Sequence, residues 1–309
     1  MNFLTKRWFH LAAGLAVAFF ATSTIALADW RDEIKVFRIG VMTGINAPYR
    51  LAQLEPFRAY LEDRLAVPVE IVPTPNFATL IEGQSRSRVH YAIYSATAFS
   101  TAAALCQCVE PLVVPTRSGG EIGFYALLIS RADGAIKSLA DAKGARLALA
   151  GADSVAGRLL PMNAFQQEGI IPSEFFSKIV DTRDPEMAVS TLLAGDADLA
   201  VAWSSLTGNY SAGYSFGVLA ALVGSGELSM EQIRVVWQSP LIPFGPHTIR
   251  LDLPGDLKSL LSAALVEMAS ERPAALDAVD RFGGLGLVAA NPDLYAPIAA
   301  LVAPVAPNQ

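Results

Sequence analysis

The sequence predicts an α/β protein with two lobes, whose doubly wound sheets are joined by two crossing strands. Short apolar runs alternate with amphipathic helical segments along most of the chain, an order typical of sheets flanked by helices. The chain has 309 residues, of which 52% are hydrophobic, enough for two cores. Two apolar runs, near residues 123–129 and 235–243, are placed to carry the chain from one lobe to the other and back. Such crossings predict a hinged cleft that closes around a ligand.

The first part of the chain predicts three strands, each followed by a helix. In the first helix Leu54, Phe57, Leu61 and Leu65 recur at helical spacing and share one face. The β-α-β-α order favours a mostly parallel sheet, with ligands at the carboxyl ends of its strands. These elements are expected, in chain order, at residues 35–42, 52–65, 69–73, 77–83, 91–94 and 97–105.

The second part continues the alternation. A long strand at residues 123–130 precedes a short helix that Gly144 ends. The remaining strands and helices are expected at residues 146–151, 159–165, 178–180, 186–194, 198–203, 234–240, 256–270 and 273–282. We therefore assign residues 35–124 and 238–302 to lobe one, and residues 125–237 to lobe two. Residues 303–309 are expected to form a loose C-terminal tail.

The strand–helix junction at residues 146–165 has features of an anion site. Ser154 stands where an N-cap belongs, and Gly157 allows the backbone to approach closely. Such a junction presents backbone N–H groups, a hydroxyl and the positive end of a helix dipole. The alternative is that Ser154 only caps its helix, because most capped helices bind nothing.

The N-terminus predicts an exported protein. Residues 1–28 contain a basic start at Lys6 and Arg7, an apolar run and a small-residue cleavage site, which together are typical of a signal peptide. Cleavage would leave 281 residues, and the loss of two cations would take the net charge from −6 to −8. This acidity disfavours nucleic acid as a partner. The expected location is the periplasm, and we expect a monomer.

Few residues in the sequence suggest catalysis or metal binding. Only His90 and His247 remain after cleavage, no hydrolase or nucleotide-binding motif is present, and both histidines are expected to be structural. Cys106 and Cys108 lack nearby partners for a metal site, so we expect either a local disulfide or two quiet thiols. The sequence therefore predicts no catalytic residues, no metal and no cofactor.

A series of segments, taken in order, resembles the phosphate-, phosphite- and phosphonate-binding proteins that serve ABC importers. These segments are residues 37–42, 68–77, 89–96, 123–129, 136–144, 154–161 and 235–243. The resemblance spans nearly the whole mature chain. It implies the type II periplasmic binding-protein fold, with a small oxyanion clamped between the lobes and an inner-membrane permease as partner.

The resemblance also implies site residues. Tyr94 matches a tyrosine that touches the oxyanion, and Ser95, Ala96 and Thr97 begin the adjoining helix. Phe77 matches an aromatic residue at the cleft edge. The segment Ser154, Val155, Ala156 and Gly157 matches an oxyanion loop rich in hydroxyls. Phosphate, phosphite and a simple phosphonate are the expected ligands.

Three departures from the family pattern bear on the ligand. Val155 and Ala156 replace two hydroxyl-bearing residues. Pro185 stands where a histidine is common, and Arg183, two residues earlier, either replaces it as an anion partner or is a solvated loop cation. Ser204 and Ser205 fall where some members carry a carboxylate that meets an ammonium group, so a cationic ligand tail is expected to fit poorly.

Two alternatives remain open. The ligand could be a different oxyanion, such as a sulfonate, because the hydroxyl donors are reduced. The protein could also be a periplasmic sensor whose partner is a membrane histidine kinase. Gene neighbourhood would separate a sensor from an importer subunit.

Overall fold

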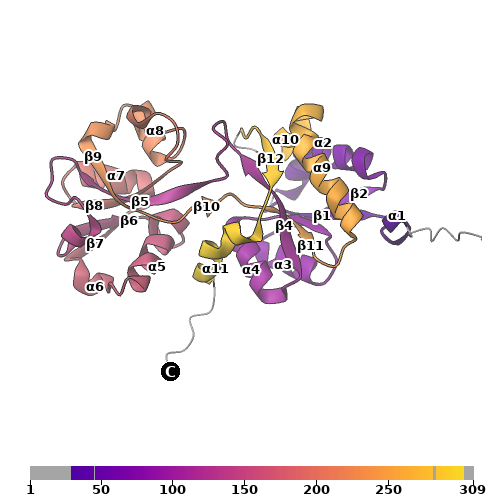
Figure 1. Cartoon of the computed structure of the whole chain (residues 1–309), viewed down its shortest axis with the longest axis horizontal. Helices are drawn as coiled ribbons and strands as arrows, with labels where there is room; N and C mark the ends of the chain where they lie inside the picture. Colours follow the sequence, from indigo (N-terminus) through magenta and orange to yellow (C-terminus); the bar gives the residue numbers. More distant parts are fainter. Residues whose placement is uncertain (1–28, 45, 281–282, 303–309) are drawn as a thin grey trace, which may run out of the picture.

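The computed structural model describes residues 29–44, 46–280 and 283–302, and it contains two mixed sheets. The first sheet has the strand order β12-β4-β11-β3-β1-β2, and the second has the order β10-β5-β8-β6-β7, with β9 paired to β5. Figure 1 shows the two sheets side by side, with β5 and β10 in the region between them. The strands are β1 Phe37–Met42, β2 Val69–Thr74, β3 Tyr91–Ile93, β4 Val109–Thr116, β5 Gly123–Arg131, β6 Arg146–Leu149, β7 Lys178–Asp181, β8 Leu199–Ser204, β9 Ile233–Gln238, β10 Ile242–Pro243, β11 His247–Arg250 and β12 Gly286–Ala289.

Helices flank both sheets. Helices α2, α9 and α10 bury apolar faces in one core of the first sheet, and α5, α7 and α8 do so in the core of the second. The α-helices are α1 Trp30–Glu33, α2 Ala47–Leu65, α3 Phe77–Ser85, α4 Ala96–Cys106, α5 Leu160–Gln167, α6 Pro172–Phe175, α7 Pro185–Leu193, α8 Val218–Gly224, α9 Gly255–Glu271, α10 Pro273–Val279 and α11 Ala296–Val302. Shorter helical turns are η1 Leu139–Ala142, η2 Val155–Leu159, η3 Tyr210–Ala212, η4 Met230–Gln232 and η5 Pro292–Tyr295.

The expected α/β class with two sheets is confirmed, but the expectation of mostly parallel strands is wrong. Parallel pairing is confined to β1 with β2 and β3, and to β6 with β7 and β8. Most antiparallel pairs involve the crossing strands or strands that directly precede or follow them. For example, β11 follows the return crossing and runs antiparallel to β3 and β4. Each sheet is therefore parallel where β-α-β units build it and antiparallel where the chain enters or leaves it.

The first sheet takes strands from two separate stretches of the chain. β1 to β4 precede every strand of the second sheet, whereas β11 and β12 follow them. This order fits an inserted second lobe, and the exact lobe boundaries stay a prediction. The predicted signal peptide and the predicted loose tail lie outside the described residues. Within the described ranges, no helix combines the length and the apolarity that crossing a bilayer requires.

Several elements differ from the sequence-based expectation. The strand β4 was not predicted, and its Pro111 and Pro115 are residues that normally argue against an interior strand. The helix α2 begins five residues earlier than expected, with a proline in its first turn. The helix expected at residues 273–282 ends at Val279. Cys106 and Cys108 form a disulfide between the end of α4 and the start of β4, with 5.0 Å between their Cα atoms.

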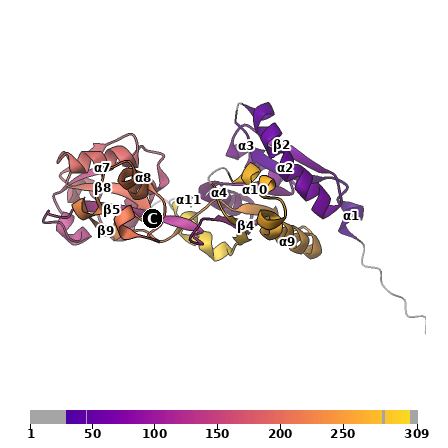
Figure 2. The same ribbon diagram turned by 90° about the horizontal axis from the view of Figure 1, so that it is seen from above.

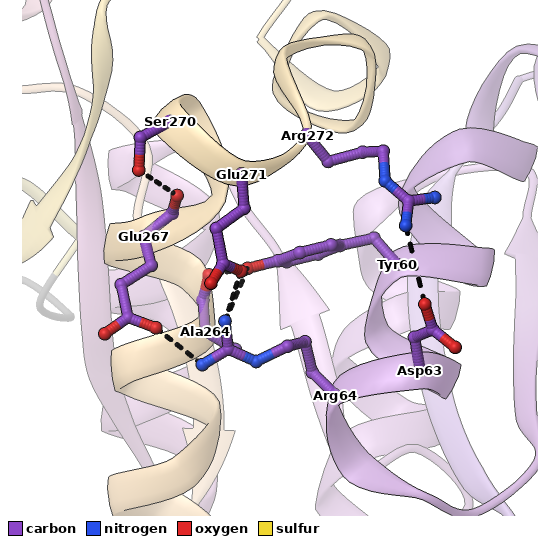
Figure 3. A network of polar contacts seen from close by, with 8 residues as sticks. All are labelled: Tyr60, Asp63, Arg64, Ala264, Glu267, Ser270, Glu271 and Arg272. Carbon is purple, nitrogen blue, oxygen red and sulfur yellow. Dashed lines mark hydrogen bonds and ion pairs between the residues drawn. The ribbon is translucent and has the colours of Figure 1, made fainter.

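A polar network fastens α2 to α9 on the outer side of the first sheet (Figure 3). The Tyr60 hydroxyl lies 2.7 Å from the carbonyl oxygen of Ala264 and 2.8 Å from the Glu271 carboxylate. Arg64 pairs with Glu267 at 2.5 Å and also with Glu271. Burial and the neighbouring Glu271 raise the pKa of Tyr60, so this hydroxyl stays a neutral donor. The network holds the two helices together, and it contains none of the predicted site residues.

Candidate functional site

The first predicted anion-binding segment begins α4. Ser95 caps this helix, because its Oγ accepts the N–H of Ala98 at 3.1 Å. The hydroxyls of Ser95 and Thr97 also lie 3.1 Å apart. Ser95, Ala96 and Thr97 therefore form one compact first turn, and the dipole of an eleven-residue helix points toward it.

The second predicted segment begins a wide helical turn. Ser154 caps η2, and its Oγ accepts the N–H of Gly157 at 3.1 Å. The turn Val155–Leu159 is a π-helix that continues directly into α5, so the helical segment begins directly after Ser154, as its expected N-cap position requires. π-turns of this kind occur frequently at functional sites.

The atoms packed around Gly157 leave no room for a side chain at this position. A Cβ atom at this position would lie 2.5 Å from the Cβ of Ala150 and 2.6 Å from the Oγ of Ser154. The helix start therefore sits directly on the carboxyl end of β6, as the sequence predicted from Ser154 and Gly157. Any larger residue would push Ser154 out of its capping position.

Both helix starts border one small apolar cluster, which we call the junction cluster. It consists of Ala126, Ala156, Leu160, Ile242 and Ile298. Ala96 from the start of α4 and Val155 from η2 both pack against it. Ile298 comes from α11, which lies between the two sheets in both views of the molecule (Figures 1 and 2). Residues of both segments that the sequence singled out therefore pack against one cluster.

Tyr94, directly after β3, and Phe77, the first residue of α3, lie next to each other. Their ring centroids are 6.2 Å apart, and the Tyr94 side chain is only 3% exposed. Burial raises the pKa of the Tyr94 hydroxyl, so it is neutral. The same hydroxyl is buried without a hydrogen-bond partner among the described residues. A buried donor left without a partner costs about 1–3 kcal/mol, and such a group needs an explanation.

The substitution Tyr94→Phe is expected to leave the stability of the ligand-free protein unchanged or to raise it by about 1 kcal/mol, because it removes only an unsatisfied hydroxyl. Chemical denaturation measures this directly. A loss of more than 1 kcal/mol would mean that the hydroxyl has a structural partner in the free protein.

Arg183 does not join the two helix starts. Its side chain is 79% exposed, and its Nε donates to the neighbouring Asp184 at 2.7 Å. The ion pair raises the pKa of Arg183, which stays a charged surface group. Of the two interpretations of this residue, the geometry fits the solvated loop cation.

Ser205 belongs to a polar network that the sequence did not predict. Its Oγ lies 2.7 Å from that of Ser215, which in turn donates to Glu121 at 2.6 Å. Thr207 donates to the same carboxylate at 2.5 Å, and the N–H of Gly119 does so at 2.8 Å. Burial raises the pKa of Glu121, but these hydrogen bonds outweigh it and lower the pKa to about 2.

Glu121 therefore brings an ionised carboxylate to the neighbourhood of Ser205, from a segment 84 residues away. No local sequence signal indicates this contact, apart from the hydroxyl-rich composition of residues 204–215. The carboxylate joins the crossing segment before β5 to the loop after β8, and three donors already satisfy it.

The two histidines serve the first sheet. The Nδ1 atom of His90 accepts the backbone N–H of Arg38 at 3.0 Å, next to β1. His247 on β11 is buried against the Tyr91 hydroxyl, and burial lowers its pKa to about 3. Both rings hold strands together.

Comparisons with known proteins agree with this architecture. A family model described as the periplasmic phosphonate-binding component of ABC transporters matches residues 39–295. The Mycolicibacterium smegmatis phosphate-import protein PhnD is 27% identical over 195 residues, which cover 62% of this chain and 59% of that protein. The Escherichia coli phosphonates-binding periplasmic protein is 26% identical over 251 residues, covering 79% of this chain and 70% of that protein.

A solved structure shares the fold. XAC2383 from Xanthomonas citri, determined with bound ATP, has a TM-score of 0.58 at 20% identity, covering 86% of this chain and 98% of its own. The match to the Mycolicibacterium smegmatis protein spans less than two thirds of that relative's length. The family match, in contrast, runs through nearly all of both sheets. The chain therefore belongs to the phosphonate-binding family of periplasmic substrate-binding proteins of ABC transporters, and it has the type II fold expected from its sequence.

Proposed function

We propose that this protein binds a small phosphorus oxyanion, namely phosphate, phosphite or a simple phosphonate, between the starts of α4 and η2, and presents it to an inner-membrane permease. The observation that carries the proposal is the shared junction cluster, because Ala96 in one capped helix start and Val155 in the other both pack against it. Family membership supports the class of ligand.

The oxyanion would be held by backbone groups and by helix dipoles. The first turn of a helix leaves N–H groups without internal partners, and the capping serines engage only those of Ala98 and Gly157. The mature protein would carry a net charge of −8, so the general field repels anions and the attraction has to be local. Such sites bind anions through short charge-assisted hydrogen bonds.

Binding is expected to draw the two helix starts together. The two sheets are connected through the crossing segments, which can act as hinges between rigid bodies. The unsatisfied Tyr94 hydroxyl gains a partner if closure brings the oxyanion to it. Tyr94→Phe would then weaken binding about tenfold without lowering stability, a combination that a structural tyrosine would not produce.

The substitution Ser154→Ala tests the oxyanion position. It removes the cap that shapes η2, so affinity for the preferred ligand is expected to fall about tenfold. Calorimetry against phosphate, phosphite, methylphosphonate, 2-aminoethylphosphonate and a sulfonate identifies that ligand.

A matched control is Ser229→Ala, because Ser229 caps η4, the turn directly before β9 of the second sheet, by accepting the N–H of Glu231 at 3.4 Å. Both variants lose a cap, but only Ser154→Ala should lose affinity. Unchanged binding in Ser154→Ala, or tightest binding to 2-aminoethylphosphonate, would contradict the assignment.

Three further points complete the proposal. Residues 1–28 direct export to the periplasm, the mature protein works as a monomer, and it does not turn its ligand over. The engagement of His90 and His247 in the first sheet supports the last point, because neither ring lies at a helix start of the site. Hydrolysis of a phosphate ester that disappears in His90→Gln or His247→Gln would contradict it.

A further inference from the structure

Four aromatic side chains form a continuous patch where the crossing segments meet. We call Phe124, Trp203, Phe216 and Phe244 the aromatic patch. The ring centroids of Phe124 and Trp203 lie 5.0 Å apart. Phe216 lies 6.2 Å from Trp203, Phe244 lies 6.2 Å from Phe124, and the centroids of Phe216 and Phe244 are 5.8 Å apart. All four rings remain partly exposed. The patch is therefore a preformed apolar surface that the free protein leaves partly in contact with water.

The aromatic patch adjoins the proposed oxyanion position. Phe124 and Trp203 pack against the junction cluster, as do Ala96 and Val155 from the two helix starts. The rings and residues of the two helix starts therefore pack against the same buried apolar cluster. Ala156, a member of this cluster, and Val155, which packs against it, are apolar at the two positions where the family resemblance implies hydroxyls.

The charged groups near the aromatic patch already have partners. The guanidinium of Arg117 lies over the Phe244 ring, 5.2 Å from its centroid, so the chain supplies its own cation there. The Glu121 carboxylate is held by Ser215, Thr207 and the N–H of Gly119. Phe124 and Trp203, the two partly exposed rings that also pack against the junction cluster, therefore fit an uncharged ring better than a cationic tail.

We infer that the ligand is an organic oxyanion that carries an aromatic ring, such as an arylphosphonate or an aryl phosphate ester. Its oxyanion lies at the starts of α4 and η2, and its ring lies against Phe124 and Trp203. The inference rests on the proposed function, because it uses the same oxyanion position, and it names the substituent that this chain selects.

Calorimetry of the full mature protein with phenylphosphonate, methylphosphonate and inorganic phosphate tests the inference. Phenylphosphonate is expected to bind at least about tenfold more tightly than methylphosphonate, because a phenyl ring offers roughly 100 Å² of additional apolar surface for burial. Equal or weaker binding of phenylphosphonate would overturn the inference and leave the proposed function intact. Failure of all three oxyanions to bind would overturn both.

Two variants locate the ring. Phe124→Leu is expected to reduce the preference for phenylphosphonate about three- to tenfold while leaving methylphosphonate affinity unchanged. Phe175→Leu is the matched control, because Phe175 is also half-buried against an aromatic neighbour, Phe176, but lies in α6. If Phe124→Leu does not fold, Phe216→Leu removes another ring of the patch. A preference that survives Phe124→Leu, or survives Phe216→Leu where Phe124→Leu does not fold, would place the ring elsewhere and contradict the assignment.

Discussion

The substitution Gly245→Ala is expected to destabilise the folded protein by about 3 kcal/mol. A Cβ atom at this position would lie 2.0 Å from the carbonyl oxygen of Tyr94 and 2.9 Å from the Cα of Ser95. Both are backbone atoms of the segment that begins α4, so no side chain can rotate away to relieve the clash. Overpacking of this kind typically costs 1–3 kcal/mol, and more when the backbone has to move. Chemical denaturation with a two-state fit measures the change.

Gly245→Ala also tests what keeps Ser95 and the start of α4 in position. The N–H of Tyr94 donates to the carbonyl of Pro246 at 3.1 Å, so the return crossing supports the loop that carries Ser95. Ligand affinity should therefore fall together with stability. Gly224→Ala is the control, because a Cβ atom there meets nothing within 4 Å and Gly224 ends a helix. A Gly245→Ala protein as stable as the control would show that this close approach is absent in solution.

Stability is expected to fall by about 2 kcal/mol between pH 7 and pH 5, largely because of His247. Burial lowers the pKa of His247 in the folded protein to about 3, whereas the unfolded chain has the ordinary value of 6.5. Below pH 6.5 His247 binds a proton in the unfolded state, whereas in the folded state it stays neutral until the pH approaches 3. The stabilisation is therefore complete above pH 6.5 and is lost as the pH falls toward 3. Burial also lowers the pKa of His90, which contributes with the same sign.

The variant His247→Gln isolates this effect. Glutamine cannot take up the proton but can still hydrogen-bond to Tyr91, so the dependence of stability on pH should flatten between pH 7 and pH 5. Denaturation curves at several pH values measure it. His90→Gln gives the smaller contribution of the second ring. An unchanged slope in His247→Gln would mean that other groups cause the loss of stability.

Local patterns in the sequence were sufficient to predict the helix start at Ser154. Ser154 and Gly157 follow from capping preference and close-packing chemistry, which act over three or four residues. The role of Ser95 came instead from the family resemblance, and the structure shows that Ser95 caps α4. The order of strands and helices follows from local periodicity, whereas the family resemblance rests on the order of the motifs.

The strand β4 and the contacts of Glu121 could not be predicted in this way, because they depend on residues that are distant in the chain. β4 contains two prolines and becomes a strand because β11 and β12 pair with it from the far end of the sequence. Glu121 meets Thr207 and Ser215 only after β5 and β8 have paired. Neither arrangement has a signal within a short window of sequence.

The sequence by itself therefore determined the α/β class and the helix start at Ser154, because hydrophobic periodicity and capping are local properties, and the order of its motifs carried the family resemblance. Only the tertiary structure decided which of the candidate residues meet. It placed Ala96 and Val155 on one cluster, left Arg183 in solvent and assembled the aromatic patch from four separate segments. The physical reason is that these contacts arise from the pairing of distant strands, and it is this pairing that brings the two sheets together at the crossing segments.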